Sequence, residues 1–240
     1  MLYLIGLGLE NEDISTKAIK AMKSCSSLYL DSYTSLGINS EQLSSLIKKP
    51  IIPVQREFLE NKLSFILGEA KTKDVAVLVQ GDCLSATTHI TLLLECKKHN
   101  IKYEIIHGIS ILTSIGETGL SLYNFGKTAS IPFQRTNLKV PYQILKDNQK
   151  SGMHTLFLLD LDPKNNKFLS IPDAISYLLS QGMKDCLCIA CCNLGTGKKI
   201  IKAGKARELL KENFHNYPQC LIIPGKTHFI EEEFLEQFRI

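Results

Sequence analysis

Short apolar runs alternate with longer amphipathic stretches along most of this 240-residue chain. The clearest run is VAVLV at residues 75–79, which has no polar face and is followed by a Gln and then by Gly81-Asp82. A strand without a polar face needs cover on both sides, as in the centre of a parallel sheet. The amphipathic stretches have the period of helices that provide such cover. The alternation therefore predicts an α/β fold with an open, mostly parallel sheet.

A loose segment at residues 120–127 divides the predicted elements into two sets. We predict one domain at residues 1–120 and a second at residues 121–240. In the first domain, strands are predicted at residues 2–7, 27–30, 74–80 and 102–107, and helices at 13–24, 41–47, 58–71, 86–99 and 110–118. In the second domain, strands are predicted at residues 128–132, 154–160, 185–192, 199–203 and 219–223, and helices at 141–149, 172–181, 205–212 and 230–238.

The composition excludes several classes of protein. Apolar residues make up 44% of the chain and charged residues 22%, as in ordinary globular proteins rather than disordered or membrane proteins. A net charge of +4 is too small, and its lysines too scattered, to indicate direct nucleic-acid binding. The apolar residues 1–9 lack a basic leader and run into the acidic segment at residues 10–13. We therefore expect no signal peptide, no membrane span and a cytoplasmic location.

The eight cysteines and six histidines do not indicate a metal centre. In the cytoplasm we expect reduced thiols rather than disulfides. A C-x-x-C spacing joins Cys188 and Cys191, but it lies in a predicted strand, where two such side chains point to opposite faces. The histidines show no ligand spacing and no convincing triad partner. We expect no metal site, and these patterns identify no catalytic residue.

Glycine-containing turns resemble nucleotide-binding motifs without completing them. Gly6 and Gly8 follow the first predicted strand, but Asn11 stands where the dinucleotide fingerprint requires a third glycine. The two glycines are compatible with a plain tight turn or with a close backbone approach to a ligand. Gly126-Lys127 and Gly197-Lys198 each lack the earlier glycine of a phosphate-binding loop, so we interpret both as turns.

Asp82 is the strongest single candidate for a functional residue. It comes directly after a buried strand and its glycine, and open α/β sheets bind ligands at the carboxyl edge of their strands. A carboxylate there can accept hydrogen bonds from ribose hydroxyls or from an ammonium group. Thr87 and Thr88 would begin the next helix, whose free N–H groups face the same edge. The alternative is that Asp82 only caps this helix.

Short motifs occur in order along the whole chain, and Ala86-Thr-Thr-His89 follows Gly81-Asp82. The other segments are residues 1–9, 13–14, 33–35, 106–107, 110–111, 119–120, 123–126, 154–156, 158–160 and 223–226. Taken together, these segments resemble the diphthine synthases. The Ala-Thr-Thr-His sequence favours this family over the related enzymes that methylate tetrapyrroles.

The resemblance implies a two-domain, tetrapyrrole-methylase-like α/β fold with an open, mostly parallel N-terminal sheet and a mixed-sheet C-terminal α/β domain. It implies a class III methyltransferase, acting as a homodimer, that holds S-adenosyl-L-methionine in the cleft between its domains and releases S-adenosyl-L-homocysteine. The implied reaction, in diphthamide biosynthesis, methylates an aminocarboxypropyl-histidine on translation elongation factor 2 to diphthine or its methyl ester. The implied cofactor contacts are Leu9, Asp82, Ser85, Ser110, Ile111, Leu159, Leu194 and Gln219.

Four departures from the family pattern keep other functions open. The family usually has Pro at Cys83, Val at Ser85, Ala-Arg-Val-Gly at residues 192–195, where Asn193 stands here, and His near Gln219. One alternative is methylation of a tetrapyrrole, which the same cofactor cleft could serve. The other, motivated by the departures, is an inactive binding module of the same fold.

Overall fold

The computed structural model describes residues 1–32, 37–55, 58 and 63–240. The chain divides into two compact units, unit 1 at Met1–Leu112 and unit 2 at Thr113–Ile240. The predicted boundary between residues 120 and 121 falls shortly after this division. Among the described residues, no helix is both long enough and apolar enough to cross a bilayer.

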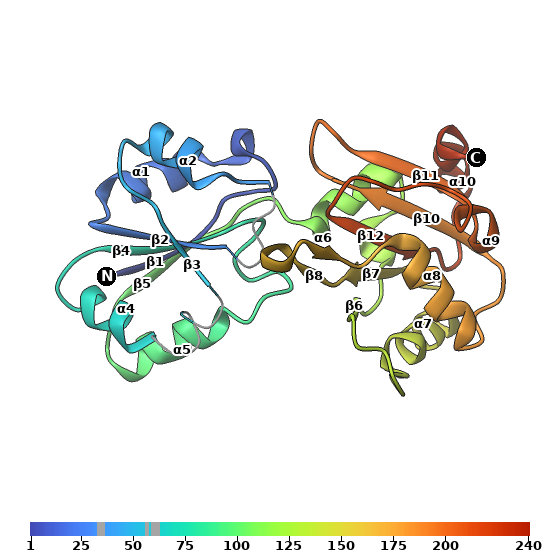
Figure 1. Cartoon of the computed structure of the whole chain (residues 1–240), viewed down its shortest axis with the longest axis horizontal. Helices are drawn as coiled ribbons and strands as arrows, with labels where there is room; N and C mark the ends of the chain where they lie inside the picture. Colours follow the sequence, from blue (N-terminus) through green and yellow to red (C-terminus); the bar gives the residue numbers. More distant parts are fainter. Residues whose placement is uncertain (33–36, 56–57, 59–62) are drawn as a thin grey trace. The chain divides into compact units, whose positions relative to one another are not determined.

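A five-stranded parallel sheet forms the centre of unit 1 (Figure 1). Its order is β3-β2-β4-β1-β5, so β4 and β5 lie on either side of β1. Sequence patterning does not predict β3, because this strand is short and contains Pro53, which is tolerated at the edge of a sheet. The strands are β1 (Leu2–Gly6), β2 (Ser27–Asp31), β3 (Ile52–Val54), β4 (Val75–Val79) and β5 (Tyr103–Ile106).

Helices cover both faces of this sheet, with α1 and α2 on one face and α4 and α5 on the other (Figure 1). Side chains of β4 alternate between the two cores: Leu78 packs with α1 and α2, whereas Val77 and Val79 pack with α4 and α5. Burial of each such side chain contributes roughly 1.5–3 kcal/mol, which explains why β4 is apolar throughout. The helices are α1 (Thr16–Ser24), α2 (Ser40–Ile47), α4 (Leu63–Ala70) and α5 (Ile90–Lys98).

Two helices of unit 1 begin later than their sequence patterns predict. Ser15 caps α1 by accepting a hydrogen bond from the N–H of Ala18 at 3.1 Å, so the helix begins at Thr16. The helix predicted from residue 86 begins at Ile90, because Ala86 has a φ of 57° and interrupts helical geometry. The helix predicted at residues 58–71 lies partly outside the described residues, and the motif at residues 33–35 lies wholly outside them.

A five-stranded mixed sheet forms the centre of unit 2, as expected, in the order β11-β10-β12-β7-β6. Its β6–β7 pair is parallel, and the other three pairs are antiparallel. Cys188 and Cys192 pack in the core beneath α7, α8 and α9, whereas Cys191 lies on the other face of β10 beside Cys220. The C-x-x-C pair therefore does not share a face. The strands are β6 (Ala129–Ile131), β7 (Thr155–Leu159), β10 (Leu187–Cys192), β11 (Ile200–Lys205) and β12 (Gln219–Ile223).

The remaining elements of unit 2 are helices and one small ribbon. α6 begins at the last residues of unit 1, and α10 lies near the C-terminus (Figure 1). The ribbon of β8 and β9 is too short to show an alternating pattern, and the sequence does not predict it. These elements are α6 (Ile111–Ser114), α7 (Val140–Lys150), β8 (Leu161–Asp162), β9 (Lys167–Phe168), α8 (Ile171–Ser180), α9 (Ala206–Leu209) and α10 (Phe229–Leu235).

A buried pair of polar side chains joins three segments of unit 2. The Nδ1 atom of His154, a fully buried residue, accepts a hydrogen bond from the N–H of Gly225 at 3.0 Å. Its Nε2 atom lies 3.5 Å from the Oε1 atom of Glu231 on α10. Glu231 also accepts hydrogen bonds from the N–H groups of Ser121 at 2.8 Å and His228 at 2.9 Å. His154 is thus a structural hydrogen-bonding residue.

We expect stability to fall as the pH drops below neutrality. Burial lowers the pKa of His154, so stability is lost as the pH falls below about 6.5, where the unfolded histidine gains a proton. Burial opposes ionisation of Glu231, but hydrogen bonds from Ser121 and His228 lower its pKa to about 2. The contribution of Glu231 to the free energy of unfolding is therefore present above about pH 4.5 and is lost as the pH falls toward 2.

Urea unfolding of Glu231→Gln across this pH range tests whether Glu231 contributes to the loss of stability in acid. Gln presents an NH2 group to one of the two N–H donors, so we expect a loss on the order of 1–3 kcal/mol at neutral pH. The dependence of the variant's stability on pH between about pH 4.5 and 2 should also be smaller than that of the parent chain. Glu233→Gln, at an exposed position of the same helix, is the control and should match the parent chain. An unchanged acid slope in Glu231→Gln would contradict this account.

Candidate functional site

Three glycines close the carboxyl ends of three neighbouring strands in unit 1. Gly6 ends β1, Gly81 comes two residues after β4, and Gly108 comes two residues after β5. A Cβ atom at Gly6 would lie 2.6 Å from the N atom of Gly108 and 2.8 Å from the O atom of Gly81. A Cβ atom at Gly108 would lie 2.5 Å from the same oxygen. Because Gly6 and Gly108 carry no side chain, the loops after β4 and β5 can meet across the end of β1.

The Gly6–Gly8 turn packs against protein backbone. Gly8 exchanges two backbone hydrogen bonds with Gly81, at 2.7 and 3.2 Å, and has a φ of 85°. Asp13 then accepts hydrogen bonds from the N–H groups of Leu9 at 2.9 Å and Glu10 at 3.2 Å. These bonds fix the position of Leu9 at the rim of the sheet. The turn therefore has a structural role of its own, beside any role in ligand binding.

Asp82 is buried and binds four donors from the protein. Its Oδ1 atom accepts hydrogen bonds from the N–H of Leu84 at 2.9 Å and from the Oγ of Ser85 at 3.2 Å. Its Oδ2 atom lies 2.7 Å from the Nδ1 atom of His107 and accepts the N–H of Gly108 at 3.3 Å. A carboxylate has about four lone-pair positions, so its hydrogen-bonding capacity is in use within the protein.

These contacts keep Asp82 ionised. Burial alone would raise the pKa of Asp82, but the hydrogen bonds from Leu84, His107 and Gly108 outweigh it and hold this pKa below its ordinary value. The carboxyl edge of the sheet therefore carries a fixed negative charge. Asp82 is 8% exposed and is neither a helix cap nor a free surface acid, since α5 begins only at Ile90.

His107 is the functional candidate that sequence patterning did not single out. It follows β5 directly, its Nδ1 atom contacts Asp82, and its side chain is 69% exposed. The sequence holds one signal for it, a polar residue at the end of a predicted strand, which resembles the position of Asp82. That signal does not reveal that His107 contacts Asp82, because β1 separates β4 from β5 in the sheet.

The other predicted residues of unit 1 lie at the same edge. Ser85 donates to Asp82, and the Oγ atom of the buried Ser110 accepts the N–H of Leu112 at 3.1 Å. Leu9 and Ile111 are half-buried, at the turn after β1 and at the start of α6. Together with Asp82, five of the eight predicted residues are thus gathered at the carboxyl ends of β1, β4 and β5.

The three predicted residues of unit 2 share one edge of its sheet. Gln219 begins β12 and pairs in register with Cys192, the last residue of β10, and Leu194 follows that strand. Leu159 ends β7, and its side chain belongs to the core of unit 2. The Oε1 atom of Gln219 accepts the N–H of Ile171 at 2.9 Å, and its Nε2 donates to two backbone carbonyls. The predicted cofactor contacts of these residues stay predictions.

Two of the departures from the family pattern have a local explanation. Cys83 is fully buried, its Sγ atom lies 3.7 Å from the carbonyl oxygens of Leu4 and Ile106, and burial raises its pKa to about 11. It is therefore a packing residue. Asn193 has a φ of 48°, a left-handed conformation that Asn adopts more readily than most residues.

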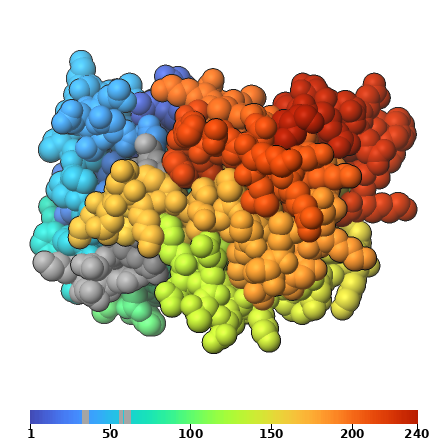
Figure 2. Space-filling view, turned by 45° about the vertical axis from the view of Figure 1, so that its right-hand side comes forward, coloured from blue at the N-terminus to red at the C-terminus, as the bar shows by residue number. Residues whose placement is uncertain are grey.

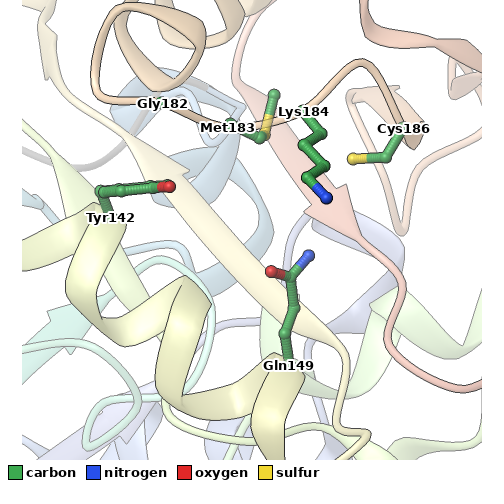
Figure 3. Close-up of a pocket in the computed structure, with 6 residues that line it drawn as sticks. All are labelled: Tyr142, Gln149, Gly182, Met183, Lys184 and Cys186. Atoms are coloured by element: carbon green, nitrogen blue, oxygen red, sulfur yellow. The ribbon is translucent and has the colours of Figure 1, made fainter.

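A pocket in unit 2 lies apart from the predicted residues of that unit. It has a volume of about 320 Å³ and is lined by residues of α7 and of the loop between α8 and β10, including Tyr142, Gln149 and Lys184 (Figure 3). It is next to the start of β10, whereas Leu194 follows the end of that strand. Among the described residues, no group of three or more His, Cys, Asp and Glu side chains could hold a metal ion.

The comparisons with known proteins assign the class of this fold and site. The family model "Tetrapyrrole (Corrin/Porphyrin) Methylases" matches residues 1–210, so the chain is a methyltransferase of the tetrapyrrole methylase family. It is 36% identical to "Probable diphthine methyl ester synthase" of Arabidopsis thaliana, over 100% of this chain and 98% of that protein. It is also 36% identical to a "Diphthine synthase" of Methanococcus maripaludis, over 98% of both chains.

A solved structure agrees with these relatives. The "Crystal structure of diphthine synthase" matches with a TM-score of 0.93 and 32% identity, over 99% of this chain and 95% of that chain. Within the tetrapyrrole methylases, the chain belongs to the diphthine synthases. The resemblance seen in the motifs is thereby confirmed, and so is the predicted two-sheet α/β fold.

We expect the glycine contact at the strand ends to be essential for stability. Gly108→Ala would place a methyl group 2.5 Å from a backbone oxygen, so backbone must move, at a cost of at least ~2 kcal/mol in the free energy of unfolding. Gly68→Ala is the matched control, since a Cβ atom there meets nothing within 4 Å in an exposed turn of α4. It should stabilise the chain by ~0.5–1 kcal/mol. Equal unfolding curves for the two variants would disprove the close contact.

Proposed function

We propose that this chain transfers methyl groups from S-adenosyl-L-methionine to the aminocarboxypropyl-histidine of translation elongation factor 2, giving diphthine or its methyl ester. The family membership supports the reaction, and one observation about the site supports its location. That observation is the ionised Asp82, held at the carboxyl edge of a parallel sheet, where α/β folds bind their ligands.

The residues at this edge fit the cofactor. A fixed negative charge at Asp82 favours a positively charged sulfonium group. The half-buried side chains of Leu9 and Ile111 offer apolar surface to a nucleoside. We propose the eight predicted residues as its contacts: Leu9, Asp82, Ser85, Ser110, Ile111, Leu159, Leu194 and Gln219.

The main task of the protein in this reaction is alignment. S-adenosyl-L-methionine supplies a methyl group that is already activated, so the nucleophile must chiefly be held in line with it. Asp82 orients this site rather than abstracting protons, because a carboxylate with a lowered pKa is a weak base and its oxygens already accept four hydrogen bonds.

We also propose that the chain works as a homodimer in the cytoplasm, as its resemblance to the family implies. The apolar side chains of Phe229, Ile230 and Phe234 on α10 are exposed, in the C-terminal part of unit 2 that is red in Figure 2. Adjacent exposed apolar side chains are typical of surfaces that contact another protein. Sedimentation of the purified chain would measure its oligomeric state.

A transfer assay tests the proposed reaction. We expect labelled S-adenosyl-L-methionine to label elongation factor 2 that carries aminocarboxypropyl-histidine, and mass spectrometry to place the label on that residue. Factor with an unmodified histidine is the control and should take up no label. Label on a tetrapyrrole substrate, or cofactor binding without any transfer, would reject the proposal in favour of a different methylase or a binding module.

The role of Asp82 is tested by binding alone. We expect Asp82→Ala to weaken S-adenosyl-L-methionine binding at least tenfold in calorimetry, about 1.4 kcal/mol, because the fixed negative charge is lost. Asp74→Ala is the matched control, since Asp74 precedes the same strand at its opposite end. Equal affinity in the two variants would remove Asp82 from the cofactor site.

A further inference from the structure

The Asp82–His107 pair leaves one ring nitrogen exposed at the edge of the sheet. An ionised carboxylate only accepts hydrogen bonds, so the Nδ1 atom of His107, 2.7 Å from Asp82, must carry the proton. In the neutral ring the Nε2 atom then holds a free lone pair. The side chain is 69% exposed, and Nε2 has no hydrogen-bond partner among the described residues. The pair therefore presents a base in a fixed tautomer at the ligand-binding edge.

Methylation of an amine is faster with such a base. An aliphatic amino group is an ammonium ion near neutral pH, and its lone pair is occupied until the proton leaves. A carboxylate, which is the nucleophile when a methyl ester forms, carries no such proton. A base at the site therefore accelerates transfer to nitrogen, whereas transfer to the oxygen of a carboxylate gains nothing from it.

His89, His99 and His154 do not meet this need. His89 and His154 are buried, and each is next to a carboxylate, Asp31 and Glu231 respectively. His99 is exposed but directly follows α5, which runs back from the carboxyl end of β4 to the amino end of β5. It therefore lies at the opposite edge of the sheet. Of the histidines in unit 1, only His107 is both exposed and located at the carboxyl edge of the sheet.

We propose that His107 is the general base of N-methylation: its Nε2 atom takes the proton of the substrate ammonium, and Asp82 positions the ring through Nδ1. The inference rests on the proposed function. The N–H bond breaks and its electron pair stays on nitrogen, which becomes the nucleophile. The new N–CH3 bond forms as the C–S bond breaks, and that pair returns to sulfur. Each methyl transfer releases one proton, which passes from the Nε2 atom of His107 to water.

Single-turnover transfer to the modified elongation factor tests this role. We expect His107→Ala to slow N-methylation at least a hundredfold, which is the lower range for removal of a general base. Its affinity for S-adenosyl-L-methionine, measured by calorimetry, should stay within about threefold of the parent chain, because Asp82 is intact. Added imidazole should restore transfer in His107→Ala. His99→Gln is the control and should transfer at the parent rate.

A second measurement does not depend on turnover. Nitrogen-15 spectra report which ring nitrogen carries the proton, and neutral His107 should be protonated at Nδ1 in the parent chain. This preference should weaken in Asp82→Asn. If the parent chain does not methylate the elongation factor, the proposed function is wrong. The spectra would still test the hydrogen bond between Asp82 and His107. Normal transfer by His107→Ala, or slow transfer without imidazole rescue, overturns the inference.

Discussion

Four donors from two loops converge on the carboxylate of Asp82, and the geometry of the strand-end site depends on them. Hydrogen bonds to a charged group typically contribute ~1.5–3 kcal/mol each, and those from His107 and Gly108 join the loop after β5 to the loop after β4. The same contacts set a negative charge and a histidine tautomer at one place. Stability and chemistry thus have a common origin at this residue.

The loops after β4 and β5 can meet at Asp82 because Gly6, at the end of β1, has no side chain between them. β4 and β5 lie on either side of β1, so their following loops meet above Gly6. A sequence reading of Gly6 and Gly8 leaves a tight turn and a ligand-binding turn both open. The structure shows close packing against Gly81 and Gly108, which explains the glycines without a ligand. The turn still fixes Leu9 at the rim of the sheet.

Unit 2 uses buried polar side chains as internal connections. Gln219 joins the start of β12 to α8, and Glu231 joins α10 to the segment at Ser121. Each lies in a buried position, where an unpaired polar atom is costly, so each is held by several hydrogen bonds. Sequence periodicity does not detect such residues, because their partners are distant in the chain. Gln219 was predicted only through its resemblance to the family.

The sequence by itself determined the strands other than β3, β8 and β9, the α/β class and the family, because burial on both faces demands continuous apolar runs and because the order of motifs is specific. It also placed Asp82 at the end of β4. Only the tertiary structure decided what Asp82 contacts. His107 lies 25 residues further on and its strand is not a neighbour of β4. Their meeting depends on a third strand and on the missing side chain of Gly6, which local patterns do not encode.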